Sequence, residues 1–212
     1  MQYALLTDRL VIGYDGWEST PIDLQVAPGS ITAILGPSGC GKSTLLSTIA
    51  GIRPALAGRV LVADIDVTSV PAHERTVGMV FQEPLLFPNF DVARNVAYGM
   101  ERQGVSRQAA RAQALELLDW VGLGGFGERS VDELSGGQAQ RVALVRALAP
   151  EPSVLLLDEP FSALDVDLRQ RLALEVSDLL RARGVAAVHV THDPAEAEAI
   201  ADHVLRFVDI SE

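Results

Sequence analysis

The stretch ITAILGPSGCGKST, residues 31–44, decides the fold of this chain. It begins with a mostly apolar, β-prone run, continues through a glycine-rich turn and leads into a helical pattern over residues 42–50. Residues 36–43 match G-x-x-x-x-G-K-[ST], a pattern in which backbone N–H groups curl around phosphate oxygens at the start of a helix. Because the match lies between a strand and a helix, we predict an α/β nucleotide-binding domain.

The residue types in this loop each suit phosphate chemistry. Lys42 is the only lysine among 17 basic residues, and its compact ammonium suits the β- and γ-phosphates better than a guanidinium fork. Ser43 offers a hydroxyl to Mg²⁺. Cys40, the only cysteine, is predicted to be a small loop residue rather than a catalytic thiol. The predicted nucleotide-contacting residues of the loop are Gly36, Pro37, Ser38, Gly39, Cys40, Gly41, Lys42, Ser43 and Thr44.

A second motif, VLLLDE, spans residues 154–159. Its continuous apolar run predicts a strand that is buried on both faces of a parallel sheet. Asp158, at the end of this run, suits a Mg²⁺ site, and Glu159 is placed to polarise an attacking water. The alternative is a core strand that ends in a solvated acidic turn. The phosphate loop favours the first interpretation, and the two motifs together predict a nucleotide hydrolase without separating kinases, motors and transporters.

The composition restricts the class of protein. The 212 residues are enough for one full domain, and 48% hydrophobic with 21% charged residues is ordinary for a folded globular chain. The formal net charge of −11 argues against a nucleic-acid partner, because phosphate backbones are bound by basic surfaces. We expect no signal peptide, and no apolar run approaches the roughly 20 residues of a membrane-spanning helix. Any role at a membrane is therefore expected to come through a partner.

Apolar periodicity predicts a sheet domain that is interrupted by a helical insertion. The predicted strands cover residues 5–12, 22–26, 31–35, 59–62, 77–81, 154–157 and 185–190, and the predicted helices cover residues 42–50, 107–121, 136–148 and 166–183. Ser106 is predicted as an N-cap and Gly184 as a C-cap. His73, His189 and His203 show no metal-ligand spacing and are predicted to be structural or exposed.

The pentapeptide LSGGQ at residues 134–138 resembles the signature of ATP-binding-cassette (ABC) ATPases, which is far more specific than the phosphate loop. Four further family motifs are matched in chain order by Tyr14, Gln82, Asp165 and His192. The resemblance implies that these are, in turn, an adenine-stacking aromatic, the Q-loop glutamine, the D-loop aspartate and the switch histidine. It covers residues 1 to about 208.

This resemblance implies a fold and its division. The expected fold is a P-loop NTPase of the α/β class, with a RecA-like core, an N-terminal antiparallel β subdomain and an inserted ABC-type α-helical subdomain. Within a single ABC ATPase domain over residues 1–212, residues 1–83 and 150–212 would form the β subdomain and core. Residues 84–149 would form the helical subdomain that carries the signature.

The resemblance also implies a reaction and its groups. ATP and Mg²⁺ are the implied cofactors, and the chain would act as a transport-coupled ATP hydrolase. The implied catalytic residues are Glu159, His192 and Gln82, and the implied Mg²⁺ ligands are Ser43, Gln82 and Asp158. In a head-to-tail dimer, the signature of one copy would close over the ATP held by the other, through Ser135, Gly136, Gly137 and Gln138. This fits the residues themselves, because a helix that opens at Ser135 has N–H groups free for a phosphate.

The segment EPLLFPNF, residues 83–90, is unusually apolar for a loop. In the family, this region lines the groove that receives a short coupling helix of the membrane subunit, and such docking needs apolar anchors. Leu86 and Phe87 are the candidate anchors. The alternative is a satellite core cluster beneath the helical insertion.

Together with FSALD at residues 161–165, this segment resembles importers of polyamine, thiamine, sulfate, molybdate or iron. We therefore expect a peripheral ATPase subunit at the cytoplasmic face of the membrane, with an integral membrane permease that docks near residues 82–90. An extracytoplasmic solute-binding protein is expected in the full system. The alternatives are a cassette of a lipoprotein-release, cell-division or small exporter system, and a non-transport ABC ATPase.

Overall fold

The computed structural model describes residues 3–14 and 16–211. The chain divides into two compact units, and each contains its own cluster of buried apolar side chains. The first unit comprises Met1–Met79, Ser153–Glu159 and Ala173–Glu212, and the second comprises Val80–Pro152 and Pro160–Leu172. The predicted α/β class is confirmed, with an antiparallel sheet, a largely parallel sheet and a group of helices.

An antiparallel sheet of four strands, in the order β4-β1-β6-β7, belongs to the first unit. Its strands are β1 (Leu5–Val11), β4 (Ile22–Val26), β6 (Ala57–Val62) and β7 (Ile65–Asp66). Along β4, buried and exposed residues alternate strictly, as expected for a strand with one face on the core. A short hairpin of β2 (Gly13–Tyr14) and β3 (Trp17–Glu18) follows β1.

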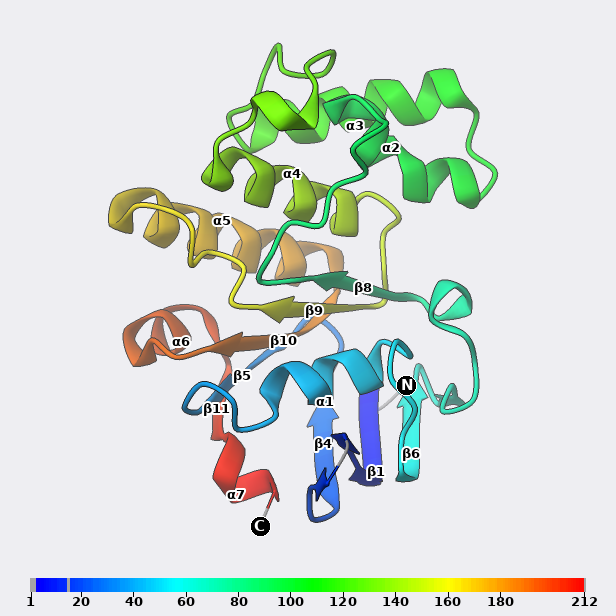
Figure 1. The fold of residues 1–212 in the computed structure, drawn as a ribbon, viewed down its shortest axis with the longest axis vertical. Coiled ribbons are helices and arrows are strands. Elements are labelled where there is room, and N and C mark those ends of the chain that lie inside the picture. The colour runs from blue at the N-terminus through cyan, green and yellow to red at the C-terminus, as the bar shows by residue number, and fades with distance from the viewer. Residues whose placement is uncertain (1–2, 15, 212) are drawn as a thin grey trace. The chain divides into compact units, whose positions relative to one another are not determined.

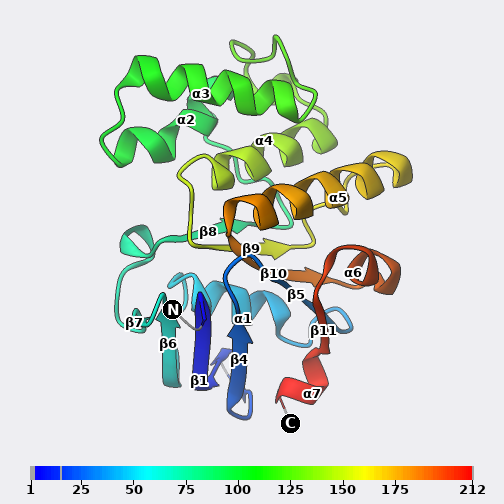
Figure 2. The same cartoon turned by 180° about the vertical axis from the view of Figure 1, so that it is seen from behind.

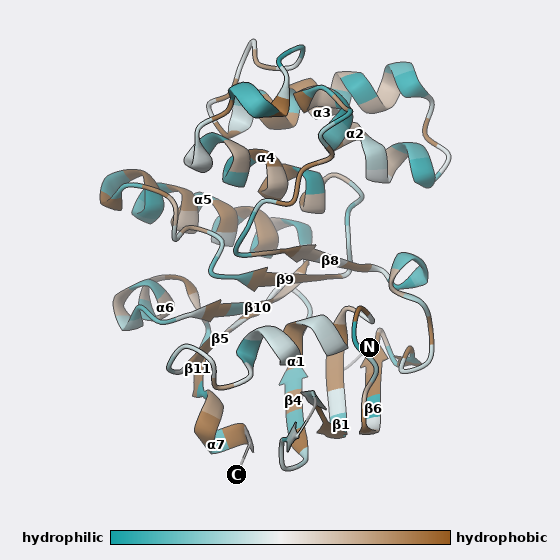
Figure 3. Ribbon diagram, in the orientation of Figure 1, coloured by the Kyte–Doolittle hydropathy of each residue, from teal (hydrophilic) through white to brown (hydrophobic). Residues whose placement is uncertain are grey.

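The second sheet has five strands in the order β11-β5-β10-β9-β8. They are β5 (Ile31–Leu35), β8 (Val77–Val80), β9 (Val154–Asp158), β10 (Ala186–Thr191) and β11 (His203–Arg206). The central strand β10 pairs in parallel with β5 and β9 (Figure 2). Every residue of β9 and β10 is buried, which explains their mostly apolar sequences (Figure 3). Parallel pairing brings the carboxyl ends of β5, β9 and β10 to one edge of the sheet.

Helices complete the first unit. They are α1 (Lys42–Ile49), the 3₁₀ helix η1 (Ala72–Glu74), the later part of α5 (Val166–Arg183), α6 (Pro194–Ile200) and α7 (Phe207–Ser211). The end of α1 is held by Arg75, whose guanidinium donates hydrogen bonds to the carbonyl oxygens of Thr48 and Ile49 at 3.2 and 2.7 Å. A cation at this end complements the helix dipole. Burial lowers the pKa of Arg75.

The second unit is mainly helical (Figure 1). Its complete helices are α2 (Val92–Arg102), α3 (Arg107–Trp120), the 3₁₀ helix η2 (Val131–Glu133) and α4 (Gly136–Leu148). The apolar faces of α2, α3 and α4 meet in a core that includes Val96, Ala110 and Val145. The predicted N-cap Ser106 is confirmed, because its hydroxyl accepts a hydrogen bond from the Ala109 N–H at 3.3 Å.

The structure adds elements that the sequence pattern did not predict. They are α2, α6, α7, β7, β11 and the β2–β3 hairpin. Helix α2 had a readable start, because Asp91 is its N-cap and accepts a hydrogen bond from the Arg94 N–H at 2.6 Å. Two predicted strands end one residue early, at Val11 and Val80. Gly184 has a φ of 67° directly after α5, as the predicted left-handed C-cap requires.

Candidate functional site

The loop of residues 36–43 joins β5 to α1 and has the geometry of an anion-binding turn. Gly39 and Gly41 have φ angles of 81° and 113°, in the left-handed region that glycine adopts without a steric penalty. Gly41 is also the N-cap of α1, and it has no side chain to hydrogen-bond the N–H groups of the first turn. Those N–H groups are therefore open to an anion.

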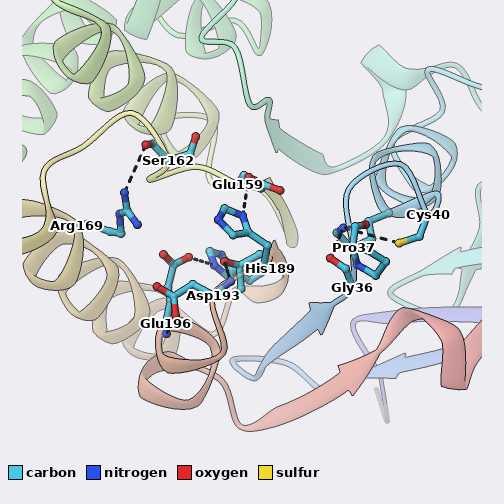
Figure 4. A network of polar contacts seen from close by, with 12 residues as sticks. Gly36, Pro37, Cys40, Glu159, Ser162, Arg169, His189, Asp193 and Glu196 are labelled. Atoms are coloured by element: carbon cyan, nitrogen blue, oxygen red, sulfur yellow. Dashed lines mark hydrogen bonds and ion pairs between the residues drawn. The ribbon is translucent and has the colours of Figure 1, made fainter.

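Lys42 stands at the start of α1 and is 5% exposed. Its Nζ donates hydrogen bonds to the carbonyl oxygens of Gly36 and Pro37 at 2.8 and 2.7 Å, and it lies 3.8 Å from Cys40 Sγ (Figure 4). The loop's own backbone thus holds the ammonium in place. Because both carbonyl partners are uncharged, a phosphate entering the loop would compensate much of the cost of burying this charge.

Two aromatic rings pack against the glycines of the phosphate loop. A methyl group at Gly41 would lie 2.8 Å from the Trp17 ring and 3.0 Å from the Phe207 ring. One at Gly36 would lie 3.2 Å from Phe207 Cβ. Phe207 begins α7 and is buried in the core of the first unit. The motif predicts these glycines from phosphate binding alone, and the two rings give a second, packing reason for them.

Asp158 and Ser43 supply oxygen ligands beside the loop. Asp158 ends β9, is 6% exposed and forms a side-chain hydrogen bond with Ser43. Burial is the largest cause of the raised pKa of Asp158, and the adjacent Glu159 carboxylate raises this pKa further. The Ser43 hydrogen bond and the charge of Lys42 act in the opposite direction. A divalent cation would neutralise the two neighbouring carboxylates, and a carboxylate with a hydroxyl is a donor set that Mg²⁺ prefers. These residues therefore fit a magnesium ion.

Glu159 and His192 meet at the same edge of the sheet. His192 Nδ1 lies 3.0 Å from Glu159 Oε2 (Figure 4). Glu159 has a φ of 46°, which is uncommon for a residue with a side chain, and its N–H donates to the Val190 carbonyl at 3.0 Å. The ends of β9 and β10 thus place a carboxylate, which is able to accept a proton, against an exposed imidazole.

Tyr14 borders a recess of about 530 Å³ that is lined by Tyr14, Gly16, Trp17, Glu18 and Leu56. Its side chain is half exposed, and its ring centroid lies 5.4 Å from that of Trp17. Since Trp17 also reaches Gly41, this aromatic recess adjoins the phosphate loop. Trp17 is a site residue that the sequence pattern did not reveal, because it belongs to none of the motifs described above and lies 24 residues before Gly41.

The signature residues open α4 in the second unit. Ser135 is the N-cap: its hydroxyl accepts from the Gln138 N–H at 3.3 Å, and Gln138 Oε1 accepts from the Ser135 N–H at 2.9 Å. This reciprocal capping box fixes the start of the helix. A methyl group at Gly136 would meet no atom within 4 Å, so this glycine faces open space.

Gly137 has a different environment, because it packs against the segment that precedes α5. A methyl group at Gly137 would lie 2.9 Å from Leu164 Cδ2. Arg169 holds the same segment by donating to the Leu164 carbonyl at 3.1 Å and the Ser162 carbonyl at 3.5 Å (Figure 4). Asp165 accepts from the Leu168 N–H at 3.0 Å, as helix N-caps do. The signature and the Asp165 segment are therefore neighbours within one unit.

Three side chains fix the backbone of residues 81–90. Gln140, 1% exposed, donates from Nε2 to the Phe81 carbonyl at 3.0 Å. Arg146 donates to the carbonyl oxygens of Pro84 and Leu85 at 3.0 and 2.8 Å. Asn95, fully buried, pairs with Phe87 through both its amide oxygen and its amide nitrogen, at 2.8 and 3.1 Å. Burial lowers the pKa of Arg146. Helix α4 therefore carries both the signature and two of the three side chains that hold this segment.

Leu86 and Phe87 differ in which of the two interpretations of this segment they support. Leu86 packs against the core of the second unit, as the satellite-core alternative expects. Phe87 is 38% exposed and forms an aromatic cluster with Phe90 and Tyr98, at centroid distances of 5.4 and 4.9 Å. Phe87 therefore lies outside that core, and its partly exposed ring is an apolar surface feature.

The predicted site residues fall into two groups, one in each unit. The structure brings together Tyr14, the phosphate loop, Asp158, Glu159 and His192 in the first unit, and the signature with Asp165 in the second. Gln82 is exposed and belongs to the second unit. Its role as a Mg²⁺ ligand, and the joining of both groups at one nucleotide, stay predictions.

The profile of the ABC transporter family matches residues 19–162, which include the phosphate loop, Asp158 and the signature. The chain belongs to the ABC transporter family. Among solved structures, it is similar to a dimeric post-hydrolysis state of the ATP-binding cassette MJ0796 bound to ADP and Pi. The TM-score is 0.87 at 28% identity, over 95% of this chain and 93% of that chain. A second structure, of the dimeric bacterial ABC transporter cassette MJ0796, matches equally well.

Curated relatives are named as iron importers. The chain is 51% identical over 184 residues to "Fe(3+) ions import ATP-binding protein FbpC" of Brucella abortus, and 50% identical over 188 residues to FbpC 1 of Rhizobium meliloti. The alignments cover 87% and 89% of this chain but 52% and 53% of the relatives, so the chain spans about half the length of the curated relatives it matches. Within residues 3–14 and 16–211, no helix combines the length and apolar character needed to cross a membrane.

Proposed function

We propose that this chain is the ATP-hydrolysing subunit of an importer and that it powers solute transport through a separate permease. The observation that carries the proposal is the 3.0 Å contact between Glu159 and His192, next to the hydrogen-bonded pair of Asp158 and Ser43. A phosphate loop alone serves many nucleotide-binding proteins. A carboxylate and a histidine at the adjoining strand ends add the groups that hydrolysis requires.

ATP binding is assigned to the first unit. The base would stack in the aromatic recess beside Tyr14 and Trp17, and the phosphates would accept hydrogen bonds from the N–H groups of the loop and from Lys42. Ser43 and Asp158 would hold Mg²⁺, with Gln82 as a further ligand. The bound ion neutralises charge on the phosphate oxygens.

Hydrolysis is assigned to Glu159 and His192. The Glu159 carboxylate accepts a proton from water as that water attacks the γ-phosphorus, and the bond to the β–γ bridging oxygen breaks to release ADP and phosphate. His192 contacts this carboxylate through Nδ1, and once the γ-phosphate is present the imidazole would donate its ring N–H to the phosphate instead. Both side chains extend from fixed strand ends, so little reorganisation is needed for the reaction.

A second copy of the chain is proposed to complete the site. One copy already holds a phosphate loop, whereas Ser135 opens a separate helix whose start is rigid and whose Gly136 faces open space. The solved cassettes named above are dimeric. In a head-to-tail dimer, the N–H groups at the start of α4 would contact the γ-phosphate held by the other copy.

The transport partner is proposed from the exposed aromatic cluster and from the names of the relatives. Phe87, Phe90 and Tyr98 would receive an apolar helix of an integral membrane permease, and the chain would then lie at the cytoplasmic face of the membrane. Ferric iron is the proposed solute, supplied by an extracytoplasmic binding protein, because the relatives named above are Fe(3+) import proteins.

Phosphate release by the purified chain tests the enzymatic part. We expect Mg²⁺-dependent hydrolysis of ATP that stops on chelation of the metal, and no hydrolysis by Lys42→Ala under the same conditions. Absence of hydrolysis at any protein concentration would contradict the proposal. Co-purification with a candidate permease, followed by iron uptake in vesicles, tests the transport part; release of lipoprotein or export of a substrate would favour an exporter instead.

A further inference from the structure

We propose that the buried pair of His189 and Glu196 is a positioning device that holds His192 against Glu159. The proposal rests on the proposed ATPase function and deepens it. His189 Nε2 lies 2.6 Å from Glu196 Oε1 (Figure 4). The His189 side chain is fully buried and the Glu196 side chain is 8% exposed. Neither residue belongs to the phosphate loop, the metal ligands or the groups assigned to hydrolysis.

The pair spans the turn that contains His192. His189 lies on β10, and Glu196 lies in the first turn of α6, so one residue precedes His192 and the other follows it. Two shorter contacts close the same turn. The Asp193 N–H donates to Thr191 Oγ1 at 3.1 Å, and Asp193 Oδ1 accepts from the Ala195 N–H at 2.9 Å. His192 is thus an exposed residue in a turn that is fixed on both sides.

The energetics favour a directional role for this pair. Helix α6 has seven residues, and Ala197 and Ile200 are its buried apolar side chains. Two such contacts hold a short helix on a sheet but fix its rotation weakly, because dispersion contacts have little directionality. A buried hydrogen bond to β10 supplies that direction, and both of its members are costly to bury unless they are paired. Loss of the pair would let α6 turn and would relax the 3.0 Å contact between His192 and Glu159.

The test measures ATP hydrolysis by the purified chain with Mg²⁺, comparing wild type with Glu196→Ala. Displacement of a reacting group by about 1 Å lowers rates by up to roughly a hundredfold, so we expect kcat to fall between about tenfold and a hundredfold. KM for ATP should change little, because neither residue of the pair belongs to the phosphate loop or to the aromatic recess. Glu196→Gln retains a hydrogen-bond acceptor of the same shape and should recover at least about half of the wild-type rate.

Glu198→Ala is the matched control, because Glu198 is an exposed carboxylate on the same helix. It should keep the wild-type rate. If Glu196→Ala fails to fold, as its melting curve would reveal, Glu196→Leu replaces it, since leucine fills the same space without offering His189 Nε2 a hydrogen-bonding group, and the same fall in kcat is expected.

A double variant separates a positioning role of the pair from an effect on stability. In His192→Ala, the side chain that the pair positions is missing, so adding Glu196→Ala should lower kcat no further. A multiplicative loss in the double variant would overturn the positioning role, as would a loss of rate that follows only the unfolded fraction. If His192→Ala alone were as active as wild type, the proposed function of His192 would fail first, and the positioning role with it.

Discussion

The phosphate loop and the segment of residues 81–90 are both irregular connections, yet they are fixed by different means. The phosphate loop is fixed from within: Lys42 bonds to carbonyl oxygens five and six residues away, and left-handed glycines set the turn. The segment of residues 81–90 is fixed from outside, by Gln140 and Arg146, which lie 59 to 62 residues away from their backbone partners.

This difference determines how each region can respond. A loop held by its own backbone keeps its shape before any ligand arrives, which suits a site that must bind phosphate with little reorganisation. A segment held by side chains of α4 is expected to follow any shift of that helix. The first arrangement suits chemistry, and the second would suit transmission between the proposed permease surface and the signature at the start of α4.

Among the substitutions that probe the two regions, Glu159→Gln is expected to have the largest effect. Removal of the proton acceptor should lower single-turnover ATP hydrolysis by at least about a hundredfold. ATP affinity should stay near that of wild type, because the phosphate loop is built independently of this side chain. Gel filtration with ATP should show a trapped dimer. Hydrolysis at the wild-type rate would remove Glu159 from the mechanism.

Lys42→Arg tests the self-contained loop directly. The guanidinium is broader than an ammonium and cannot keep both carbonyl contacts inside a turn this tight. Nucleotide affinity or turnover should fall at least tenfold, which is about 1.4 kcal/mol. Titration with a fluorescent ATP analogue and steady-state hydrolysis measure the two quantities. If nucleotide affinity and turnover both stayed near their wild-type values, the loop would not depend on the compact ammonium of Lys42.

Asn95→Ala breaks the support of the other region. The fully buried amide bonds to Phe87 through both ends, so its removal leaves backbone groups unpaired and should cost about 1–3 kcal/mol of unfolding free energy. The melting temperature should fall by several degrees. The matched control is Asn89→Ala, an exposed asparagine in the same segment, which should leave the melting temperature unchanged. Equal effects of the two substitutions would contradict the clamp.

Phe87→Ala is expected to have the smallest effect on the isolated chain. The ring is 38% exposed, and loss of its aromatic contacts should cost about 1 kcal/mol of stability and leave basal ATP hydrolysis nearly unchanged. In the assembled complex, the same truncation should weaken permease binding by about 2 kcal/mol, roughly thirtyfold. A fall of many degrees in the melting temperature, with ATP hydrolysis lost in parallel, would return Phe87 to the core.

Prediction from sequence succeeded where the determinants are local in the chain. The strand, glycine-rich turn and helix over residues 31–49, the buried strand before Asp158 and the caps at Ser106 and Gly184 were confirmed, because each depends on neighbouring residues. Helix α2 was not predicted, although Asp91 is a typical N-cap residue and the apolar residues after it have helical spacing. Its start follows an apolar loop, which obscured the period.

The long-range contacts had no comparable signal. Phe207, near the end of the chain, packs on Gly36 and Gly41, which lie near its beginning. Leu164 packs on Gly137, although α4 and β9 lie between these two residues in the sequence. Pairing of this kind follows from topology, which places distant segments together only after the sheet has formed. A single sequence therefore predicts which residues would carry the chemistry, but not which residues hold them in place.

The contact of Trp17 with the phosphate loop has a practical consequence. The chain has two tryptophans, and each lies in a different unit: Trp17 beside Gly41, and Trp120 at the end of α3. A Trp120→Phe chain would therefore emit from a single indole next to the nucleotide. Its intrinsic fluorescence would report nucleotide arrival and departure in real time, without a dye attached to either the protein or ATP.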